Sequence, residues 1–322
     1  GNQSVELIKS AVQSTHGPAV LAGVGSFGGL YSAVGIKALN HPVLVASTDG
    51  VGTKVMLCMQ NGCYKGIGKD IVNHCVNDIL VQGAFPLFFM DYFASSTLKP
   101  KIVAEVVSGM AEACRDANCA LLGGETAEMP GIYQENHFDV VGTIVGILDK
   151  SSLLPHMDIK PGDLLVGLAS SGPHTNGYSL IRKVFNEVTL EHIYPELGQP
   201  LGNILLEPHK SYFPVLKAAI EFGLLKGLAH ITGGGFIDNI PRILPQGCGA
   251  RINKKSWEIP TLFQLIENLG KIDPDEMYRV FNMGIGMVAV IESQNLAEFQ
   301  SSVGEQSWII GEVTVGESVI LE

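Results

Sequence analysis

Asp149-Lys-Ser-Ser-Leu-Leu-Pro-His-Met-Asp-Ile-Lys-Pro-Gly-Asp163 divides the chain into two parts that each have the length of a domain. The stretch holds two prolines, many polar residues and a Pro-Gly turn signal, a composition typical of a connection between domains. The chain has 322 residues, which is long for one core and suits two domains of ~150 residues. We therefore predict an N-terminal domain over residues 1–152 and a C-terminal domain over residues 153–322.

Short apolar runs alternate with helix-like runs on both sides of this stretch. The apolar runs are rich in Val, Ile and Phe and are bounded by Gly, Asp or Pro, as strands are. The alternation predicts a mixed α/β (α+β) protein. The predicted strands are Val43–Thr48, Leu87–Phe93, Val140–Leu148, Leu164–Ala169, Gly286–Ile291 and Trp308–Val313, and the predicted helices are Ile67–Gln82, Lys101–Ala117, Gly177–Glu187, Pro208–Glu221 and Leu296–Ser301.

Composition excludes several classes of protein. Hydrophobic residues make up 46% and charged residues 16%, which excludes a disordered chain. The net charge of −11 argues against nucleic acid as a partner. No apolar stretch reaches the ~20 residues of a membrane span, and no signal peptide is visible, so we expect no membrane association. The six cysteines form no C-x-x-C pair, which favours buried thiols in a reducing cytoplasm.

The segment Gly23-Val-Gly-Ser-Phe-Gly-Gly29 formally satisfies the dinucleotide fingerprint G-x-G-x-x-G. The strand before it is short, and Gly35 weakens the helix that should follow, so we discount dinucleotide binding. Two interpretations stay open. The loop binds an anion through its backbone N–H groups, or it is an ordinary surface turn.

The segment Ser47-Thr-Asp-Gly-Val-Gly-Thr-Lys54 places an acid, two glycines, a hydroxyl and a lysine at the end of a predicted strand. Asp49 there suits Mg²⁺, and Lys54 suits a phosphate. The order Gly-Thr-Lys is not a Walker A loop. The alternative is a polar hairpin with an exposed lysine.

The predicted helix around residues 67–82 carries Asp70, His74 and Asp78 at a spacing of four, so they share one face. Its other side is apolar enough to be buried. Buried carboxylates must be paired or metal-bound, and Asn77 and Asp78 are the best second contributor to a metal site. His74 is better explained as a hydrogen-bonded structural histidine.

In the segment Leu121-Leu-Gly-Gly-Glu-Thr-Ala-Glu-Met-Pro-Gly131, an apolar strand runs into a double glycine and two acids. Glu125 and Glu128 with Thr126 suit a metal–phosphate site. The alternative is the acid/base pair of a glycosidase, for which sequence spacing gives no carboxyl separation.

Two loops of the second half end at helix N-termini, which favour phosphates. They are Ser170-Ser-Gly-Pro-His-Thr-Asn-Gly-Tyr178 and His230-Ile-Thr-Gly-Gly-Gly-Phe-Ile-Asp-Asn-Ile-Pro-Arg242. His174 and Arg242 there would supply a charge or a proton. The alternative interpretation is that each loop only connects a strand to a helix and caps the helix. No G-x-S-x-G elbow occurs, so acyl chemistry has no support.

Taken together, these segments resemble the phosphoribosylformylglycinamidine cyclo-ligases, also called aminoimidazole ribonucleotide synthetases. The matching blocks follow the family order over nearly the whole chain, and their joint occurrence is specific. They are Thr48-Asp-Gly-Val-Gly-Thr-Lys54, Cys75-Val-Asn-Asp78, Gly123-Gly-Glu-Thr-Ala-Glu-Met-Pro130, Ser171-Gly-Pro-His-Thr-Asn-Gly-Tyr-Ser-Leu180, Thr232-Gly-Gly-Gly235 with Asn239-Ile-Pro-Arg242, and Phe281-Asn-Met-Gly284.

The resemblance implies a two-domain synthetase fold. The N-terminal domains pair into a β-barrel across a homodimer, and the C-terminal domain is a mixed sheet flanked by helices. It also implies ATP-dependent cyclisation of formylglycinamidine ribonucleotide to aminoimidazole ribonucleotide, with release of ADP and phosphate, in the fifth step of de novo purine synthesis. ATP is then a substrate, Mg²⁺ a cofactor, and a K⁺ requirement stays open.

The combined interpretation assigns roles to residues. We expect His174, Lys54 and Asp78 to be catalytic, with His174 polarising the reacting amide or moving a proton. We expect Mg²⁺ at Asp49, Asp78 and Glu125. The predicted ATP and phosphate residues are Asp49, Gly50, Gly52, Thr53, Lys54, Asn77, Gly123, Gly124, Glu125 and Thr126, and the predicted substrate residues are Gly25, Gly28, Gly29, Ser171, Gly172, His174, Asn176, Thr232, Gly233, Gly234 and Gly235.

Two departures from the family pattern stand out. Family members usually carry a further N-terminal segment with Tyr-Lys-x-Ala-Gly-Val-Asp, which closes over the nucleotide, so we expect an incomplete ATP site without it. Thr175 stands where family members often have Ser, and it keeps the hydroxyl group.

The rivals are selenophosphate synthetase, thiamine-phosphate kinase, the hydrogenase carbamoyl-dehydrating protein and a non-catalytic nucleotide-binding regulator. No cysteine precedes Cys58, which argues against the first. The joint presence of Asp49, Lys54, Asp78, Glu125 and His174 argues against a pure binder.

Overall fold

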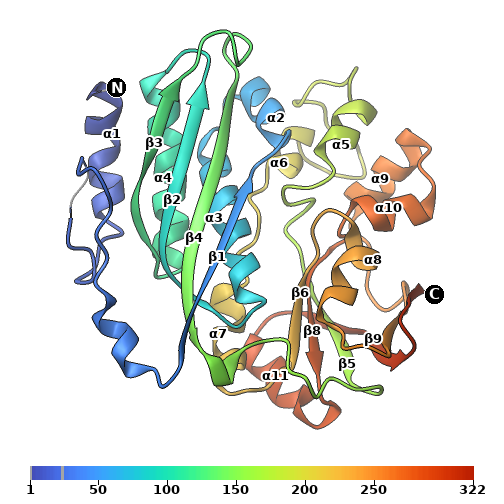
Figure 1. The fold of residues 1–322 in the computed structure, drawn as a ribbon. Coiled ribbons are helices and arrows are strands. Elements are labelled where there is room, and N and C mark those ends of the chain that lie inside the picture. Colours follow the sequence, from blue (N-terminus) through green and yellow to red (C-terminus); the bar gives the residue numbers. More distant parts are fainter. Residues whose placement is uncertain (1, 23–24) are drawn as a thin grey trace. The chain divides into compact units, whose positions relative to one another are not determined.

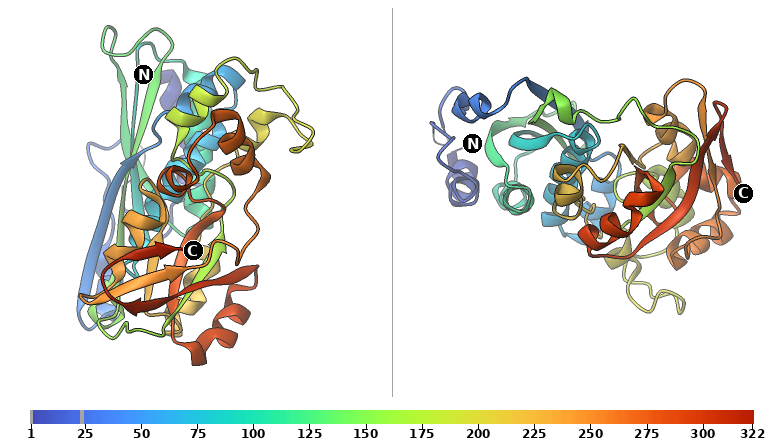
Figure 2. Two further views of the ribbon diagram at one scale, coloured as in Figure 1. Left: turned by 90° about the vertical axis from the view of Figure 1, so that its right-hand side faces the viewer. Right: turned by 90° about the horizontal axis from the view of Figure 1, so that it is seen from below.

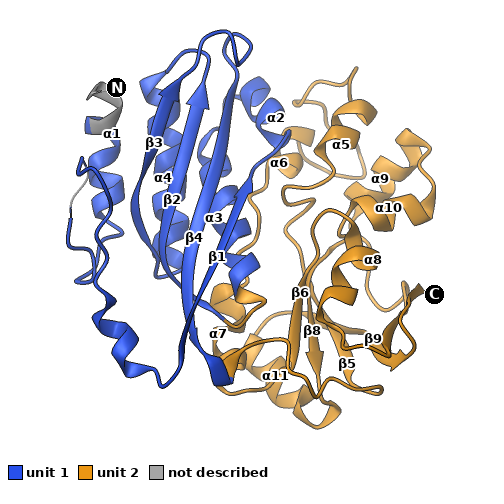
Figure 3. Cartoon of the chain, viewed as in Figure 1, with its two compact units in different colours: residues 1–79, 84–151 blue, residues 80–83, 152–322 orange. Residues whose placement is uncertain are grey.

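The computed structural model describes residues 2–22 and 25–322, which form two compact units (Figure 3). Unit 1 comprises residues 1–79 and 84–151, and unit 2 comprises residues 80–83 and 152–322. Each unit is a mixed sheet with helices, so the predicted α/β class is confirmed. Within the described part of the chain, no helix has the length and apolar character needed to cross a bilayer.

The sheet of unit 1 has four strands in the order β1-β4-β2-β3 (Figure 1). β2 and β3 run parallel, and the other pairs are antiparallel. β4 alternates strictly between buried and half-buried residues, so one face is packed and the other is open. The strands are β1 (Pro42–Gly50), β2 (Phe85–Ser95), β3 (Ala120–Glu128) and β4 (Phe138–Asp149).

Helices cover the packed face. A side chain at Gly142 or Gly146 would collide with Ile71 or Ile79 of α3, so the glycines let this helix approach β4 closely. α1 packs beside α4, as the right-hand view of Figure 2 shows. The helical elements are α1 (Asn2–Gln13), the 3₁₀ helix Ala33–Ala38, α2 (Lys54–Asn61), α3 (Lys65–Leu80), whose last residue Leu80 is assigned to unit 2, and α4 (Pro100–Asp116).

Two glycines set the crossing of α3 and α4. A Cβ on Gly68 would collide with backbone atoms of Val106 and Met110, and one on Gly109 would collide with the backbone of Lys65. The helices therefore meet backbone to backbone, and this contact fixes the face of α3 that carries His74 and Asp78.

The sheet of unit 2 has six strands in the order β10-β7-β9-β5-β8-β6. Only the β10–β7 pair is parallel. β8 is buried at every residue, as expected for a strand covered on both faces. The strands are β5 (Leu164–Ala169), β6 (Gly227–His230), β7 (Cys248–Ile252), β8 (Ile285–Ile291), β9 (Ser307–Val315) and β10 (Val319–Leu321), and the helices are α5 (Tyr178–Val184), α6 (Leu201–Leu205), α7 (Phe213–Glu221), α8 (Gly235–Asn239), α9 (Thr261–Gly270), α10 (Pro274–Val280) and α11 (Leu296–Val303).

Two predicted boundaries are wrong in ways that matter for the site. α7 begins at Phe213, so residues 208–212 form an irregular connection instead of the predicted first turn of a helix. β3 does not end at its double glycine but continues through it to Glu128, because its ladder with β2 is maintained. Glu125 is therefore a strand residue.

Candidate active site

Asp49, His74 and Asp78 form one polar cluster where β1 ends against α3. His74 Nε2 lies 2.9 Å from Asp49 Oδ2 and 3.7 Å from Asp78 Oδ2. Ser47 Oγ donates to Asp78 Oδ2 at 3.1 Å. The side chains of Asp49 and Asp78 are 43% and 25% exposed. The predicted structural role of His74 agrees with these contacts.

The charges in this cluster support one another. Burial pushes the pKa of His74 down, but the hydrogen bond to Asp49 and the charge of Asp78 raise it overall. Burial pushes the pKa of Asp49 up, but the hydrogen bond and charge of His74 lower it overall. An ionised Asp49 beside Asp78 fits Mg²⁺, which prefers carboxylate oxygens.

Lys54 is held by a buried ion pair within unit 1. Its side chain is fully buried at the start of α2, and Nζ lies 2.9 Å from Oδ1 of Asp70, which is also fully buried. A buried ammonium is retained only with such a partner. The placement argues against the predicted contact of Lys54 with phosphate and gives this lysine a structural role, joining α2 to α3.

A cavity of about 530 Å³ lies in unit 1 between α1, α4 and the β2–β3 edge. It brings together the predicted substrate loop and one predicted phosphate segment, which the sequence placed apart. Gly23 of the loop lies outside the described residues. The predicted residues that line the cavity are Gly25, Gly28, Gly29, Gly123, Gly124, Glu125 and Thr126.

Asp91 of β2 also lines this cavity and is absent from the predicted site. It pairs in register with Gly124, where the missing side chain leaves room for the carboxyl group. Burial raises the pKa of Asp91 to about 7. The only signal in the sequence is a single acid inside an otherwise apolar strand.

The raised pKa of Asp91 predicts a pH-dependent effect of Asp91→Asn. The folded state keeps the proton to about pH 7, whereas the unfolded chain loses it near pH ~4, so Asp91 lowers stability increasingly as the pH rises between these values. We expect Asp91→Asn to be more stable relative to wild type at pH 8 than at pH 4.5, by about 1–3 kcal/mol after allowance for solvent screening.

Urea unfolding of both proteins at the two pH values, with EDTA present, measures this difference. The exposed Asp116→Asn at the end of α4 is the control. An equal stability difference at both pH values would contradict the raised pKa.

The sheet separates the predicted metal ligands. Asp49 lies on β1 and Glu125 on β3, the two outer strands, so β4 and β2 run between them. Strand spacing of about 4.8 Å puts their backbones roughly 14 Å apart, whereas Mg²⁺ binds oxygen at about 2.1 Å. Asp49 and Asp78 can share one ion, but Glu125 of the same chain cannot join it.

In unit 2, the loop from Ser171 to Gly177 holds His174 in an uncommon conformation. His174 has φ +61°, in the left-handed region, and is 1% exposed. The backbone N–H of Ser171 donates to His174 Nε2 at 3.2 Å, and Ser171 Oγ donates to the carbonyl of Pro208 at 2.6 Å. A buried non-glycine residue in this region is typical of a functional site, where the surrounding contacts hold the strain.

Asparagine side chains hold the two glycine-rich loops of unit 2. Asn239 Nδ2 donates to the carbonyl of Gly235 at 2.7 Å, and Asn282 Nδ2 donates to that of Gly172 at 2.8 Å. A Cβ on Gly233 would lie 3.4 Å from Asn176 Oδ1, so the loops are adjacent. The predicted residues in these loops, Ser171, Gly172, His174, Asn176, Thr232, Gly233, Gly234 and Gly235, are thus brought together.

The remaining predicted residues lie around the polar cluster of unit 1. Gly50 is the last residue of β1, and its backbone N–H donates to Asp49 Oδ1. Gly52 has φ +71°, and Thr53 stands at the N-cap position of α2 without a side-chain capping hydrogen bond. Asn77 is fully buried on α3. Sequence analysis also missed His209, which stacks on His174, and His230, whose Nε2 lies 3.0 Å from His209 Nε2.

Two family models match the chain. The model described as AIR synthase related protein, N-terminal domain, matches residues 32–148, and that of the C-terminal domain matches residues 160–322. The phosphoribosylformylglycinamidine cyclo-ligase of Thermoanaerobacter pseudethanolicus (strain ATCC 33223 / 39E) is 49% identical, covering 100% of this chain and 96% of the relative. That of Desulfitobacterium hafniense (strain DSM 10664 / DCB-2) is 49% identical, covering 98% of this chain and 93% of the relative.

Solved structures share the fold. Thiamine-monophosphate kinase from Stenotrophomonas maltophilia K279a matches with a TM-score of 0.72 at 14% identity, covering 99% of this chain and 96% of that one. E. coli HypE matches with a TM-score of 0.70 at 19% identity, covering 98% and 92%. The family models and the full-length relatives show that this chain belongs to the phosphoribosylformylglycinamidine cyclo-ligase family of AIR synthase related proteins.

Proposed function

We propose that this chain closes the imidazole ring of aminoimidazole ribonucleotide from formylglycinamidine ribonucleotide and ATP, releasing ADP and phosphate in purine biosynthesis. The observation that carries the proposal is the 49% identity to a cyclo-ligase over the whole chain. The fold neighbours at 14–19% identity support the architecture alone.

The polar cluster of unit 1 supplies the first part of the mechanism. Asp49 and Asp78 would hold Mg²⁺, which neutralises phosphate charge when bound. His74 keeps Asp49 ionised, and Ser47 orients Asp78 through its hydrogen bond. Glu125 and Thr126 line the separate cavity with Asp91, where the 25–29 loop offers backbone N–H groups to a phosphate.

The loops of unit 2 supply the second part. His174, held in place by the 171–177 loop, is the group we assign to proton transfer or polarisation of the reacting amide. Gly233, Gly234 and Gly235 offer backbone to an anionic group, and Asn239 fixes their conformation.

We also propose a homodimer that pairs through the open face of the unit 1 sheet. Leu44 is 60% and Met90 is 37% exposed on this face, beside Thr48 and Thr143. Exposed apolar side chains on an uncovered sheet suit pairing with a second copy. We place the enzyme in the cytoplasm, and the free thiols of its cysteines agree with a reducing compartment.

Phosphate release from ATP that depends on formylglycinamidine ribonucleotide tests the function. We expect turnover with this substrate and none with thiamine phosphate. In Asp49→Asn, the loss of one carboxylate ligand should lower kcat by ~100-fold or more. Asp116→Asn is the control. Substrate-independent phosphate release would contradict the function, and wild-type turnover in Asp49→Asn would contradict the metal assignment.

A further inference from the structure

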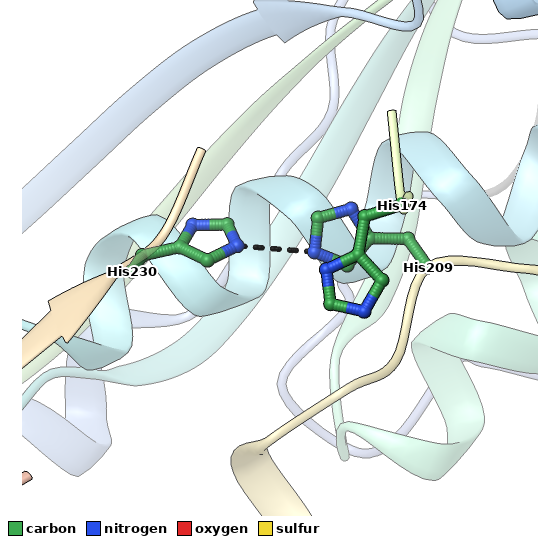
Figure 4. A group of neighbouring side chains, drawn as sticks. All are labelled: His174, His209 and His230. Atoms are coloured by element: carbon green, nitrogen blue, oxygen red, sulfur yellow. Dashed lines mark hydrogen bonds between the residues drawn. The ribbon is translucent and has the colours of Figure 1, made fainter. Parts of the chain in front are cut away.

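Three buried histidines from separate segments of unit 2 meet in one cluster (Figure 4). His174 lies in the loop before α5, His209 in the connection before α7, and His230 at the end of β6. Their exposed fractions are 1%, 1% and 6%. Nothing in the ring-closing reaction proposed above requires His209 or His230, so their convergence on His174 calls for a separate explanation.

The ring nitrogens are close enough to share an ion. His209 Nε2 lies 3.0 Å from His230 Nε2, and one nitrogen of each of the three residues lies within 4.8 Å of the others. Zinc–nitrogen bonds of about 2.0–2.1 Å in a tetrahedron place two ligand nitrogens about 3.3–3.4 Å apart. The pair His209 and His230 needs only a few tenths of an ångström of adjustment.

His174 needs a rotation of its ring. The rings of His174 and His209 stack with centroids 4.0 Å apart and 21° between their planes. Stacked rings direct their nitrogen lone pairs side by side, so His174 must turn about its side-chain torsions to aim at the same point. This turn gives up the hydrogen bond that the backbone N–H of Ser171 donates to His174 Nε2.

The surroundings favour a metal ligand set. His209 Nδ1 lies 3.3 Å from the hydroxyl of Thr175. A hydrogen bond at this nitrogen fixes the ring orientation, as is usual for ligating histidines, while Nε2 of His209 faces Nε2 of His230 in a hydrogen bond that a shared ion would replace. Mg²⁺ and Ca²⁺ prefer oxygen ligands, so a site of three imidazoles without a carboxylate does not suit them. It suits borderline ions such as Zn²⁺.

We propose that His174, His209 and His230 form a binding site for one Zn²⁺ ion per chain, with a fourth position left for water. If His174 serves the proposed ring closure, bound Zn²⁺ occupies its imidazole and inhibits turnover. That consequence rests on the proposed function, whereas the binding itself does not.

Calorimetric titration of EDTA-treated, full-length protein with Zn²⁺ tests the site. We expect one equivalent to bind, and the affinity to fall at least 30-fold in His209→Asn and in His230→Asn. His192→Asn, an exposed histidine of the same unit, should bind like wild type.

Zinc X-ray absorption of the wild-type protein keeps the proposal testable if a variant fails to fold. It should count three imidazole nitrogens in the first shell. Absence of saturable binding, unchanged affinity in a folded His209→Asn, or a first shell of carboxylate oxygens would each overturn the proposal. Zinc binding without any ring-closing activity would overturn the proposed function and leave the site intact.

Discussion

We expect His174→Asn to lower kcat for ring closure by ~10²–10⁴-fold, the range of a lost general acid or base. Asn is the appropriate replacement because it tolerates the left-handed backbone that His174 adopts at φ +61°. The variant therefore removes the titratable ring and keeps the loop conformation. Steady-state phosphate release at saturating ATP and substrate measures the effect.

Two controls separate catalysis from folding in this experiment. His192→Asn removes an exposed histidine of unit 2 and should keep wild-type turnover. Thermal unfolding of His174→Asn should show a single folded protein, since Asn239 and Asn282 still hold the adjacent loops. A folded His174→Asn with kcat within threefold of wild type would contradict the catalytic assignment.

The sequence predicted best where one local rule determines the structure. The spacing of four between His74 and Asp78 put both on one face of α3, and their contact follows from helix geometry. β5 has the predicted bounds, since an apolar run between an aspartate and a polar loop has no competing structure. The fold class followed from the alternation of such runs.

The failures come from pairing between distant segments. The prediction joins Glu125 and Asp49 at one ion, but the strand order β1-β4-β2-β3 places them on opposite edges of the sheet. Asp91 was hidden for the same reason, because only its register with Gly124 shows that it reaches the cavity. His209 was missed because residues 208–212 have the composition of a helix start, whereas its tertiary contacts with His174, Thr175 and His230 lie in an irregular connection.

Lys54 is the clearest case in which distant pairing decides the role of a residue. We expect Lys54→Met to lower the free energy of unfolding by ~3–5 kcal/mol. The substitution keeps most of the apolar stem but removes the ammonium from the carboxylate of Asp70, and both side chains have an exposed fraction of 0%. A buried charge that loses its partner pays its full desolvation cost. Urea unfolding measures the loss.

A second variant identifies the cause. Lys54→Met/Asp70→Asn removes both charges, and we expect it to recover more than half of the loss, because the uncompensated carboxylate is gone. Lys65→Met breaks an ion pair whose lysine is 54% exposed and should cost at most ~1 kcal/mol. If Lys54 instead contacted phosphate, Lys54→Met would unfold like wild type and raise the KM for ATP. The burial of Lys54 against Asp70 argues for the first outcome, and for a lysine that supports the metal site by holding α2 on α3.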